Sequence, residues 1–476
     1  VLFLSLSFLL LANLAAAQNL ELDLTPGAAD EAAGTQVVHM TLRNPKTIPV
    51  SLVAFEFYSF PARVVTVSGD GWDCWNAQPG HELCRFVPAI EAGGTTVADF
   101  TLSYPTKAGH TRVTVGVRWN EPVAVVDTLD VALYRRFAVT HNGDGGAGSL
   151  RDAIRLLNAD AACINDPCRV DFQTSGIIDV LQSPLPLIAA GEVLLDGESK
   201  IEIRGDALEA GEGLQIHSRN ATVRGLAVTG FPFNGVSIQP PIFGGFATFV
   251  FENDRIARNG HRGLVVSGGV FTGIVRDNVF ENNRRSGLFV ADSQSVGFSL
   301  APVFHVTGNR VVDNGASGMF FGPTSDGAFV HDNVITGNGD FGVAIGRGAR
   351  NMRVESNVIA GNGVSAIDIG LDGPNRVATL FSASFDPATG RTTITGAGES
   401  IGYGTLTQTF YASDAPGNVR ELIGSVASDP RTGAFTAVFD RDLRGKYIAS
   451  ITLRTINADG SLLYDTSELS NAVRVE

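Results

Sequence analysis

The sequence predicts an all-β protein organised around a solenoid, in which short coils of chain stack on one another. One column of polar residues recurs at steps of 24, 31, 24 and 24 positions: Asp254, Asn278, Asn309, Asn333 and Asn357. A second column follows five positions later: Asn259, Asn283, Asn314, Asn338 and Asn362. A third lies nine positions after the first: Gly263, Gly287, Gly318, Gly342 and, replacing glycine, Ala366. A short fixed period with asparagine and glycine in register indicates stacked repeats.

Apolar residues alternate within each unit, which indicates strands rather than helices. Three positions before the first column the residues are Phe251, Val275, Val306, Val330 and Val354, and two after it they are Ile256, Phe280, Val311, Ile335 and Ile359. Ten and twelve positions after it stand the pairs Leu264/Val266, Leu288/Val290, Met319/Phe321, Val343/Ile345 and Ile367/Ile369. We expect these columns to point inward. The asparagines are expected at turns, because asparagine tolerates the left-handed conformation.

These N-x-[VI]-x-x-N-x(3)-G-[LMV] units resemble the repeats of right-handed parallel β-helix proteins of the pectate-lyase-like superfamily. The resemblance covers roughly Phe137 to Gly373. That superfamily includes pectate lyases, polygalacturonases, periplasmic copper-site proteins and many secreted proteins. The resemblance implies a right-handed parallel β-helix, here from about Val170 to Gly373. It implies little about activity, because one fold carries many functions.

Composition and the first residues indicate an exported protein. The chain has 476 residues, and its 35 basic and 49 acidic residues give a net charge of −14, which disfavours nucleic acid as a partner. The apolar run over residues 1–17 ends in alanines and predicts a signal peptide. No later stretch has the length and apolarity of a membrane span. We therefore expect a soluble product outside the cell or at its surface, with the periplasm as an alternative.

Changes in the residue pattern along the chain predict the domain boundaries. We expect a signal peptide at 1–17, an Ig-like β-sandwich at 18–134, the β-helix with an N-terminal capping helix at 135–375, and a C-terminal β-sandwich at 376–476. The phrases Gly71–Cys74 and Glu91–Gly94 resemble an immunoglobulin-like repeat of bacterial surface proteins. The phrase Thr466–Val475 resembles the sandwich that often follows such β-helices.

The capping helix is predicted by its start signal. Ser149 is the expected N-cap, Asp152 follows three positions later, and Leu150, Ile154 and Leu157 fall on one face. Such a helix closes the open end of a solenoid against edge pairing.

Four cysteines in an exported chain are more often bridged than metal-bound. We expect the disulfides Cys74–Cys84 and Cys163–Cys168, since each pair is close in sequence. Trp72 and Trp75 flank the first of them. This aromatic pair either stacks on sugar or packs beside the disulfide.

By analogy with β-helix enzymes, the candidate binding face is the strand that follows the glycine column. Its outward residues are Val265, Phe289, Phe320, Ala344 and Asp368, with Gln215 and Ser237 in earlier coils. One acid in this column argues against lyase or hydrolase chemistry there. Phe289 and Phe320 offer an aromatic floor, and the turn before it carries the basic residues His261, Arg262, Arg284 and Arg285. This combination suits an anionic or neutral glycan.

Two insertions, Gln239–Ala247 and Ala291–Pro302, are expected to leave the same corner of the coils and form a second wall. Alternatively, these loops or the N-terminal domain cover the two phenylalanines.

A second column interleaves acid, base and imidazole: Glu252, Arg276, Thr307, His331 and Glu355, with Asp277 and Asp332 beside it. Such alternation is typical of surface ion pairs. His331, Asp332, Asp277 and Arg276 are nevertheless the candidates for catalysis. The eight histidines lack metal-ligand spacing, so neither a metal nor another cofactor is expected.

Three functions follow from these observations. The first is non-catalytic binding of a polysaccharide or cell-surface glycan, of adhesin or matrix type. The second is a polysaccharide lyase, hydrolase or epimerase with an atypical site, and the third is a structural spacer. The sequence does not predict the ligand's identity, the oligomeric state or a means of anchoring.

Overall fold

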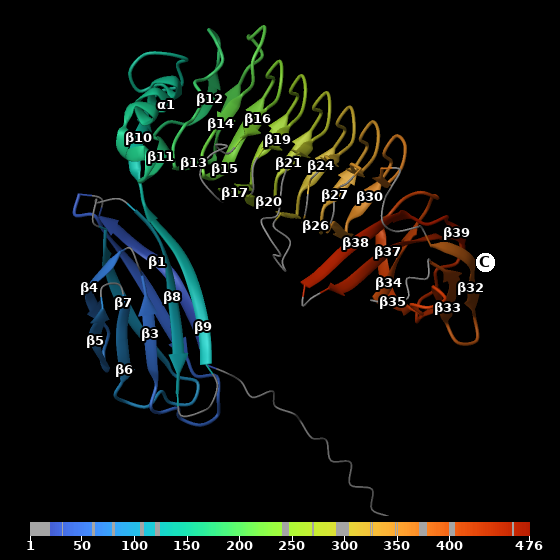
Figure 1. Cartoon of the computed structure of the whole chain (residues 1–476), viewed down its shortest axis with the longest axis horizontal. Coiled ribbons are helices and arrows are strands. Elements are labelled where there is room, and N and C mark those ends of the chain that lie inside the picture. The colour runs from blue at the N-terminus through green and yellow to red at the C-terminus, as the bar shows by residue number, and fades with distance from the viewer. Residues whose placement is uncertain are drawn as a thin grey trace, which may run out of the picture. The chain divides into compact units, whose positions relative to one another are not determined.

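A computed structural model gives the architecture (Figure 1). It describes residues 20–30, 32–59, 62–78, 81–104, 109–119, 124–239, 247–268, 271–291, 304–323, 325, 327–347, 349, 351–370, 378–398, 405–458 and 461–476. The expected signal peptide lies outside these ranges. The chain forms two compact units, Val1–Arg135 and Arg136–Glu476.

The first unit consists of two antiparallel sheets. One has the strand order β1 (Glu21–Asp30), β2 (Thr35–Arg43), β7 (Thr95–Ser103) and β4 (Arg63–Ser68). The other has the order β5 (Trp72–Gln78), β6 (His81–Phe86), β3 (Ala54–Tyr58), β8 (Gly109–Arg118) and β9 (Ala124–Leu133). Buried residues of both sheets, among them Met40, Phe57 and Phe100, form one core. This architecture agrees with the expected sandwich, and its Ig-like character stays a prediction.

The second unit contains the predicted solenoid, with all its coil-to-coil pairs parallel. Its first face comprises β13 (Glu192–Arg204), β15 (Asn220–Thr229), β17 (Ala247–Glu252), β20 (Phe271–Arg276), β23 (Phe304–Thr307), β26 (Ala328–His331) and β29 (Arg353–Glu355). The second comprises β18 (Arg255–Ala257), β21 (Val279–Glu281), β24 (Arg310–Val312), β27 (Val334–Thr336) and β30 (Val358–Ala360). The third comprises β14 (Leu214–Ile216), β16 (Val236–Ile238), β19 (Leu264–Ser267), β22 (Leu288–Ala291), β25 (Met319–Phe321), β28 (Val343–Ile345) and β31 (Ile367–Ile369).

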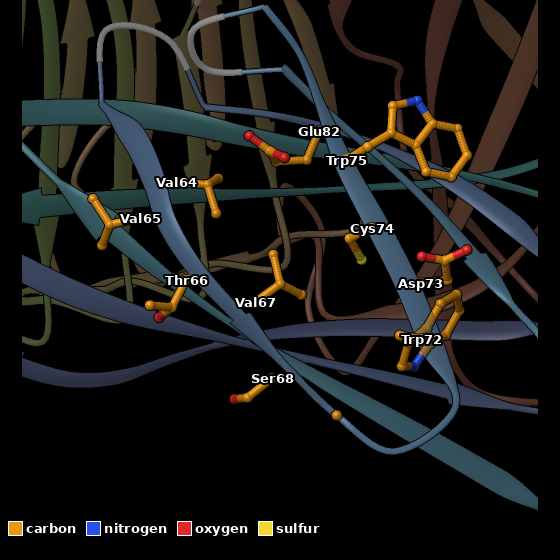
Figure 2. Close-up of a pocket in the computed structure, with 11 residues that line it drawn as sticks. Val64, Val65, Thr66, Val67, Ser68, Trp72, Asp73, Cys74, Trp75 and Glu82 are labelled. Carbon is orange, nitrogen blue, oxygen red and sulfur yellow. The ribbon is translucent and has the colours of Figure 1, made fainter.

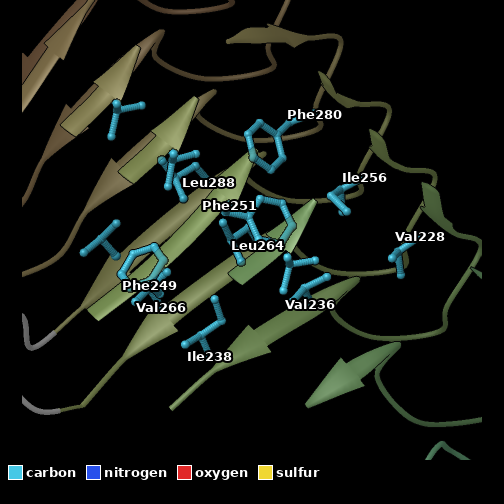
Figure 3. Packing of buried hydrophobic residues seen from close by; sticks show 14 of the residues in the cluster. Val228, Val236, Ile238, Phe249, Phe251, Ile256, Leu264, Val266, Phe280 and Leu288 are labelled. Carbon is cyan, nitrogen blue, oxygen red and sulfur yellow. The ribbon is translucent and has the colours of Figure 1, made fainter. Parts of the chain in front are cut away.

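The interior of the coils is the apolar core that the sequence predicts. Figure 3 shows Phe251, Ile256 and Leu264 meeting inside the coils, from three different strands. Every residue of the four inward columns is buried in the structure. The predicted columns and the parallel pairing are therefore confirmed.

Two ladders of buried asparagines join the coils at their corners. In the first, the side-chain amide of Asn278 donates to Oδ1 of Asn309 over 2.9 Å, and Asn309 donates likewise to Asn333. In the second, Asn283 donates to Oδ1 of Asn314 over 3.0 Å. Each Oδ1 also accepts a backbone N–H from the preceding coil, and each Nδ2 also donates to a backbone carbonyl of that coil. The ladders thus satisfy the backbone groups that the corners would otherwise leave unpaired.

The expected conformation of these asparagines was wrong by one position. The left-handed residue is the one just before each ladder asparagine. In the first column these residues are Asn253, Asp277, Gly308, Asp332 and Ser356, all with φ between 54° and 68°. The ladder asparagine itself is needed as a buried donor and acceptor, and its neighbour makes the turn.

The N-terminal end of the solenoid is closed by a helical cap. Its elements are β10 (Arg135–Val139), α1 (Leu150–Ala159), η1 (Ala161–Ile164), β11 (Pro167–Phe172) and β12 (Gly176–Asp179). Ser149 caps α1 as predicted, accepting the N–H of Asp152, and Leu150, Ile154 and Leu157 are buried. Arg151, which the apolar pattern did not single out, is also buried and forms an ion pair with Asp144 over 2.6 Å.

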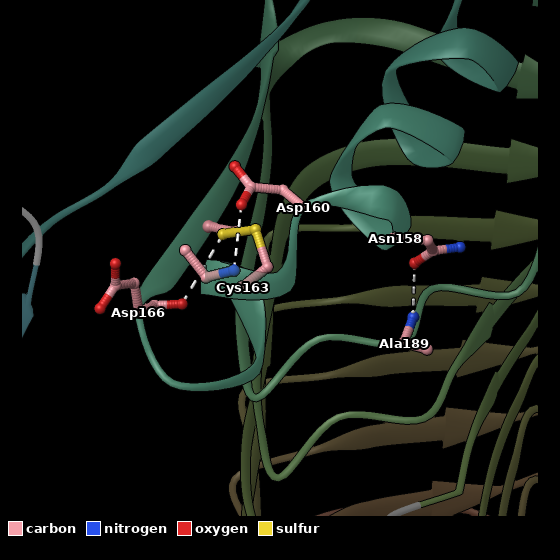
Figure 4. The surroundings of a disulfide bond; sticks show 7 residues. Asn158, Asp160, Cys163, Asp166 and Ala189 are labelled. Carbon is pink, nitrogen blue, oxygen red and sulfur yellow. Dashed lines mark hydrogen bonds between the residues drawn. A yellow bond between two sulfur atoms is a disulfide. The ribbon is translucent and has the colours of Figure 1, made fainter.

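Both expected disulfides are present, joining Cys74 to Cys84 and Cys163 to Cys168. The second follows the capping helix directly. Figure 4 shows it beside two side-chain contacts that fix this segment: Oδ1 of Asp160 accepts the backbone N–H of Ala162, and Oδ1 of Asn158 accepts that of Ala189.

The C-terminal region follows the last coil in two small antiparallel sheets. One contains β32 (Thr379–Asp386), β33 (Arg391–Ala397) and β36 (Ala434–Phe439). The other contains β34 (Thr405–Ser413), β35 (Glu421–Ser428), β37 (Tyr447–Ala458), β38 (Ser461–Leu469) and β39 (Val473–Arg474).

This region supplies acceptors to four backbone N–H groups of the last coil. Those of Val354 and Ser356 donate to the hydroxyls of Thr466 and Tyr411, over 3.0 and 3.1 Å. Those of Ile359 and Gly361 donate to the carbonyl of Val419 and to Oδ1 of Asn418. Side chains and one carbonyl thus replace the next coil.

Asp254 begins the first ladder with a carboxyl where later coils have an amide. Its Oδ1 accepts the N–H of Leu226 over 2.7 Å, and its buried Oδ2 has no hydrogen-bond partner. Burial raises the pKa of Asp254 well above the usual aspartate range, and the nearby charge of Glu252 acts in the same direction. A protonated carboxyl can donate as an asparagine amide does, and a carboxylate cannot.

We predict that Asn333→Ala lowers the free energy of unfolding by about 3 kcal/mol, because it leaves several buried partners unpaired. The Asn333 amide contacts Asn309, Asn357 and the carbonyl of Val306. Thermal or denaturant unfolding measures the effect. The exposed Asn165→Ala is the control, and equal stability of the two variants would contradict a stabilising ladder.

We predict that Asp254→Asn raises stability at pH 7, by about 1–3 kcal/mol, because an amide satisfies the position that a carboxylate leaves unpaired. A carboxyl whose folded-state pKa is raised stabilises the fold below its unfolded pKa and loses that contribution as pH rises. The gain should therefore shrink towards pH 4. Denaturant unfolding at both pH values, with the exposed Asp277→Asn as control, tests this. A gain that does not depend on pH would count against it.

Candidate functional site

The third face of the solenoid aligns the outward column that the sequence singled out. Backbone pairing places Val265, Phe289, Phe320, Ala344 and Asp368 side by side in successive coils. Phe289 and Phe320 are partly exposed. Val265, at 6 % exposure, and Ala344, at 2 %, are buried, so the open part of the column is shorter than expected.

The two phenylalanine rings stack on each other along the solenoid. Their centroids lie 5.3 Å apart with 6° between the planes, which is close to the spacing of adjacent coils. Each ring therefore turns one face to the other, and ring edges point away from the core. The two rings thus form a stack along the coils, and they do not lie side by side as two open ring faces.

Arg262 covers the other face of Phe289. Its guanidinium carbon lies 3.6 Å from the ring centroid, at cation–π distance. Burial lowers the pKa of Arg262, and the positive charge of Arg285 lowers it further. The side chain remains cationic because arginine titrates far above neutral pH.

His261 is held in one orientation beside this stack. Its ring lies parallel to that of Phe233, with centroids 4.5 Å apart. Its Nδ1 lies 3.0 Å from Oδ1 of Asn234, an acceptor, so Nδ1 carries the proton. Burial lowers the pKa of His261, and the charges of Arg262 and Arg285 lower it further, which favours the neutral imidazole.

Arg284 and Arg285 complete what we call the basic cluster: His261, Arg262, Arg284 and Arg285. Both arginines are exposed, and Arg285 donates its backbone N–H to the carbonyl of His261 over 2.7 Å. None of the three arginines has an ion-pair partner among the described residues. Several other arginines on the solenoid form ion pairs, among them Arg224–Asp196, Arg255–Glu281 and Arg276–Glu252.

Sequence reasoning missed Phe233, Asn234 and Glu212, which support the cluster. Asn234 accepts from His261 and donates to Oε1 of Glu212 over 2.7 Å. Phe233 and Asn234 directly precede Gly235, the glycine-column residue of an irregular coil. Extending the glycine column to that coil would have found them. The wall predicted from the two insertions lies almost wholly outside the described residues.

The column of charged residues that includes Arg276 and His331 forms pairs on the surface of the solenoid. Arg276 contacts Glu252 over 2.5 Å, and His331 Nδ1 contacts Asp332 over 2.7 Å. The hydroxyl of Thr307 approaches the same Nδ1, at 3.4 Å. In a hydroxyl–histidine–carboxylate relay the two partners contact opposite ring nitrogens. The geometry therefore favours surface pairing for His331, Asp332 and Arg276, while Asp277 is an exposed turn residue.

Comparison with known proteins agrees with this architecture. Residues 193–377 match the family model described as periplasmic copper-binding protein (NosD). The chain is a right-handed parallel β-helix protein. The periplasmic family and the two disulfides give it an extracellular or periplasmic location. Among the described residues, no helix of the β-helix protein is long and apolar enough to cross a membrane.

Similarity to solved structures is weak. The Agl-KA catalytic domain is 13% identical, with 74% of this chain and 81% of that chain covered, at a TM-score of 0.21. The catalytic domain of a GH87 alpha-1,3-glucanase in complex with nigerose is 10% identical, with 74% and 94% covered, at a TM-score of 0.13. Such scores carry no argument about function. No curated protein matches the sequence.

The residues of this β-helix protein do not fit the copper site that the family description implies. The four cysteines are taken up in disulfides. Met40, Met319 and Met352 are buried in apolar cores. In the part of the chain that the structure describes, no three His, Cys, Asp or Glu side chains converge as metal ligands. Copper prefers thiolate, thioether or imidazole ligands, so no copper chemistry is assigned to these residues.

We predict that Arg285→Ala raises the pKa of His261, because it removes a positive charge that disfavours the imidazolium. An NMR titration of the imidazole measures the change. Arg284→Ala is the control, since only burial and the charges of Arg262 and Arg285 shift the pKa of His261, and the His261 titration in this variant should follow that of the wild type. An unchanged midpoint in Arg285→Ala would show that the two side chains do not interact.

Proposed function

We propose that this β-helix protein binds acidic glycans without catalysis, through the basic cluster and the Phe289–Phe320 stack. The observation that carries the proposal is a set of three neighbouring arginines, Arg262, Arg284 and Arg285, without an ion-pair partner in the described part of a chain whose net charge is −14. An exposed arginine without a carboxylate partner is available to a carboxylate or sulfate of a ligand, which it contacts in a bidentate manner.

The shape of the cluster supports an acidic ligand over a neutral one. Neutral sugars commonly bind flat aromatic faces, and the faces between Phe289, Phe320 and Arg262 are already occupied. Arg284 and Arg285 extend from the turn before Phe289 and are exposed. The cluster occupies two adjacent coils, about 5 Å apart, which suits one acidic sugar unit.

The rival functions explain fewer of these features. An enzyme of the lyase or hydrolase type needs more than one acid, and Asp368 is the single acid of the outward column, with its pKa raised by burial. A spacer accounts for the paired columns and the ladders but leaves the basic cluster without a role. Under the proposal, residues 135–375 present the binding face, and the domains at 18–134 and 376–476 flank it in an adhesin or matrix protein.

The test is Arg284→Ala/Arg285→Ala, titrated with polygalacturonate and dextran sulfate by calorimetry, with neutral dextran for comparison. We predict at least about a tenfold loss of affinity for the acidic polymers, since each lost charged contact is worth about 1.5–3 kcal/mol. The loss should shrink in high salt, which screens exposed charges.

The control is Arg155→Ala/Arg310→Ala, which removes the same charge at exposed positions outside the cluster. It should bind like the wild type. An equal loss in both variants would mean non-specific attraction, and absence of binding by the wild type would refute the proposed function.

A further inference from the structure

The first unit contains a hollow of about 480 Å³ between two strands that belong to different sheets. β4 is the edge strand of one sheet and β5 the edge strand of the other. They follow each other in the chain, joined by a short turn at Gly69 and Gly71, yet they pair with β7 and β6 and not with each other. The volume lies within the range of about 300–1,000 Å³ that is typical of ligand pockets.

Two tryptophans on β5 line this hollow (Figure 2). Trp72 is anchored: its ring lies 4.6 Å from that of Phe55, and its Nε1 donates to the carbonyl of Val97 over 3.1 Å. Trp75 exposes 48 % of its surface. The sequence left open whether the pair packs or binds sugar, and the structure separates them: Trp72 packs and Trp75 is open.

The strand that carries Trp75 is held rigidly. The Cys74–Cys84 disulfide joins directly opposed residues of β5 and β6. Trp75 itself lies opposite Leu83 in the same hairpin. A half-exposed indole on a cross-linked hairpin binds at low entropic cost, because little of it must be ordered on binding.

The rest of the lining is polar and acidic. Thr66 and Ser68 of β4 are exposed hydroxyl residues, and Asp73 and Glu82 contribute carboxyl groups. Asp73 forms an ion pair with Arg85 over 2.7 Å, and Glu82 is only 5 % exposed. The two edge strands add backbone N–H and C=O groups along both walls. These donors and acceptors can form hydrogen bonds with the hydroxyl groups of a neutral ligand. An acidic ligand would instead face two carboxyl groups, which disfavour a negative charge nearby.

We propose that this hollow binds one neutral sugar unit of a polysaccharide, with an apolar ring face against Trp75 and hydroxyls on the polar wall. An aromatic body with a few placed polar groups is the usual composition of a small-ligand site. The site is separate from the basic cluster in unit, charge and ligand, and it does not rest on the proposed function.

An extended peptide strand is the competing occupant, since both walls are strand edges. The pairing of β4 shifts register between Val64 and Thr66, which marks a bulge, and Val65 is 55 % exposed there. Bulges on edge strands interrupt regular backbone pairing and protect against strand addition. The irregular edge therefore favours the sugar.

The experiment titrates the full chain with cellohexaose, laminarihexaose and maltohexaose by calorimetry, comparing wild type, Trp75→Ala and Trp75→Phe. At least one of these neutral sugars should bind the wild type, Trp75→Ala should lower that affinity at least about tenfold, and Trp75→Phe should retain most of it. Melting curves establish that both variants are folded. Arg284→Ala/Arg285→Ala should leave this affinity unchanged, which separates the two sites.

Absence of binding to all three hexasaccharides would overturn the proposal. Equal affinity of wild type and Trp75→Ala would do the same, by placing the sugar elsewhere. Protection of β4 and β5 amides from hydrogen exchange by an added peptide, without any sugar binding, would show a strand acceptor in place of a sugar site.

Discussion

The hydrogen bonding of the coil corners is the constraint on which the β-helix depends. Strands pair with the strands above and below, but the chain must turn between them, and a turn exposes backbone groups that have no strand partner. The buried asparagines resolve this, because each amide offers an acceptor to the coil before and donors to both neighbouring coils. No apolar residue of similar size supplies both functions.

A ladder of this kind has two ends, and different groups complete the hydrogen bonding at each end. At the first rung Asp254 replaces asparagine, and burial raises the pKa of its carboxyl well above the usual aspartate range. At the last coil the hydroxyls of Tyr411 and Thr466 and the amide of Asn418 stand in for the missing coil. Burial raises the pKa of Tyr411 to about 12, so its hydroxyl stays uncharged in this contact.

The fold was predictable because its constraints repeat in the sequence. A buried column is a position that must be apolar in every coil, and a ladder is a position that must be asparagine, so both appear as periods. The placement of the left-handed residue was harder, since Asn253, Asp277 and Ser356 share a conformation but not an identity. The contacts that Tyr411 and Thr466 make with the last coil occur only once, so they produce no periodic pattern in the sequence.

The candidate site was predictable in position but not in form. Alternation placed Phe289 and Phe320 outward, and the turn before them placed the arginines nearby. It did not predict that Arg262 reaches across to the next coil, or that Asn234 orients His261, because both depend on side-chain directions between coils. Trp72 and Trp75 show the same limit: neighbours in sequence, one is anchored in the core and one is open.

The contacts made by the C-terminal region have a consequence for assembly. The last coil presents four backbone N–H groups, at Val354, Ser356, Ile359 and Gly361, in the geometry of a strand edge awaiting a partner. Left bare, such an edge is a template on which another chain can add, and repeated addition produces filaments. The C-terminal region occupies those donors with three side chains and the carbonyl of Val419, so these edge positions are not open to another chain. Growth of the β-helix thus ends within the same polypeptide.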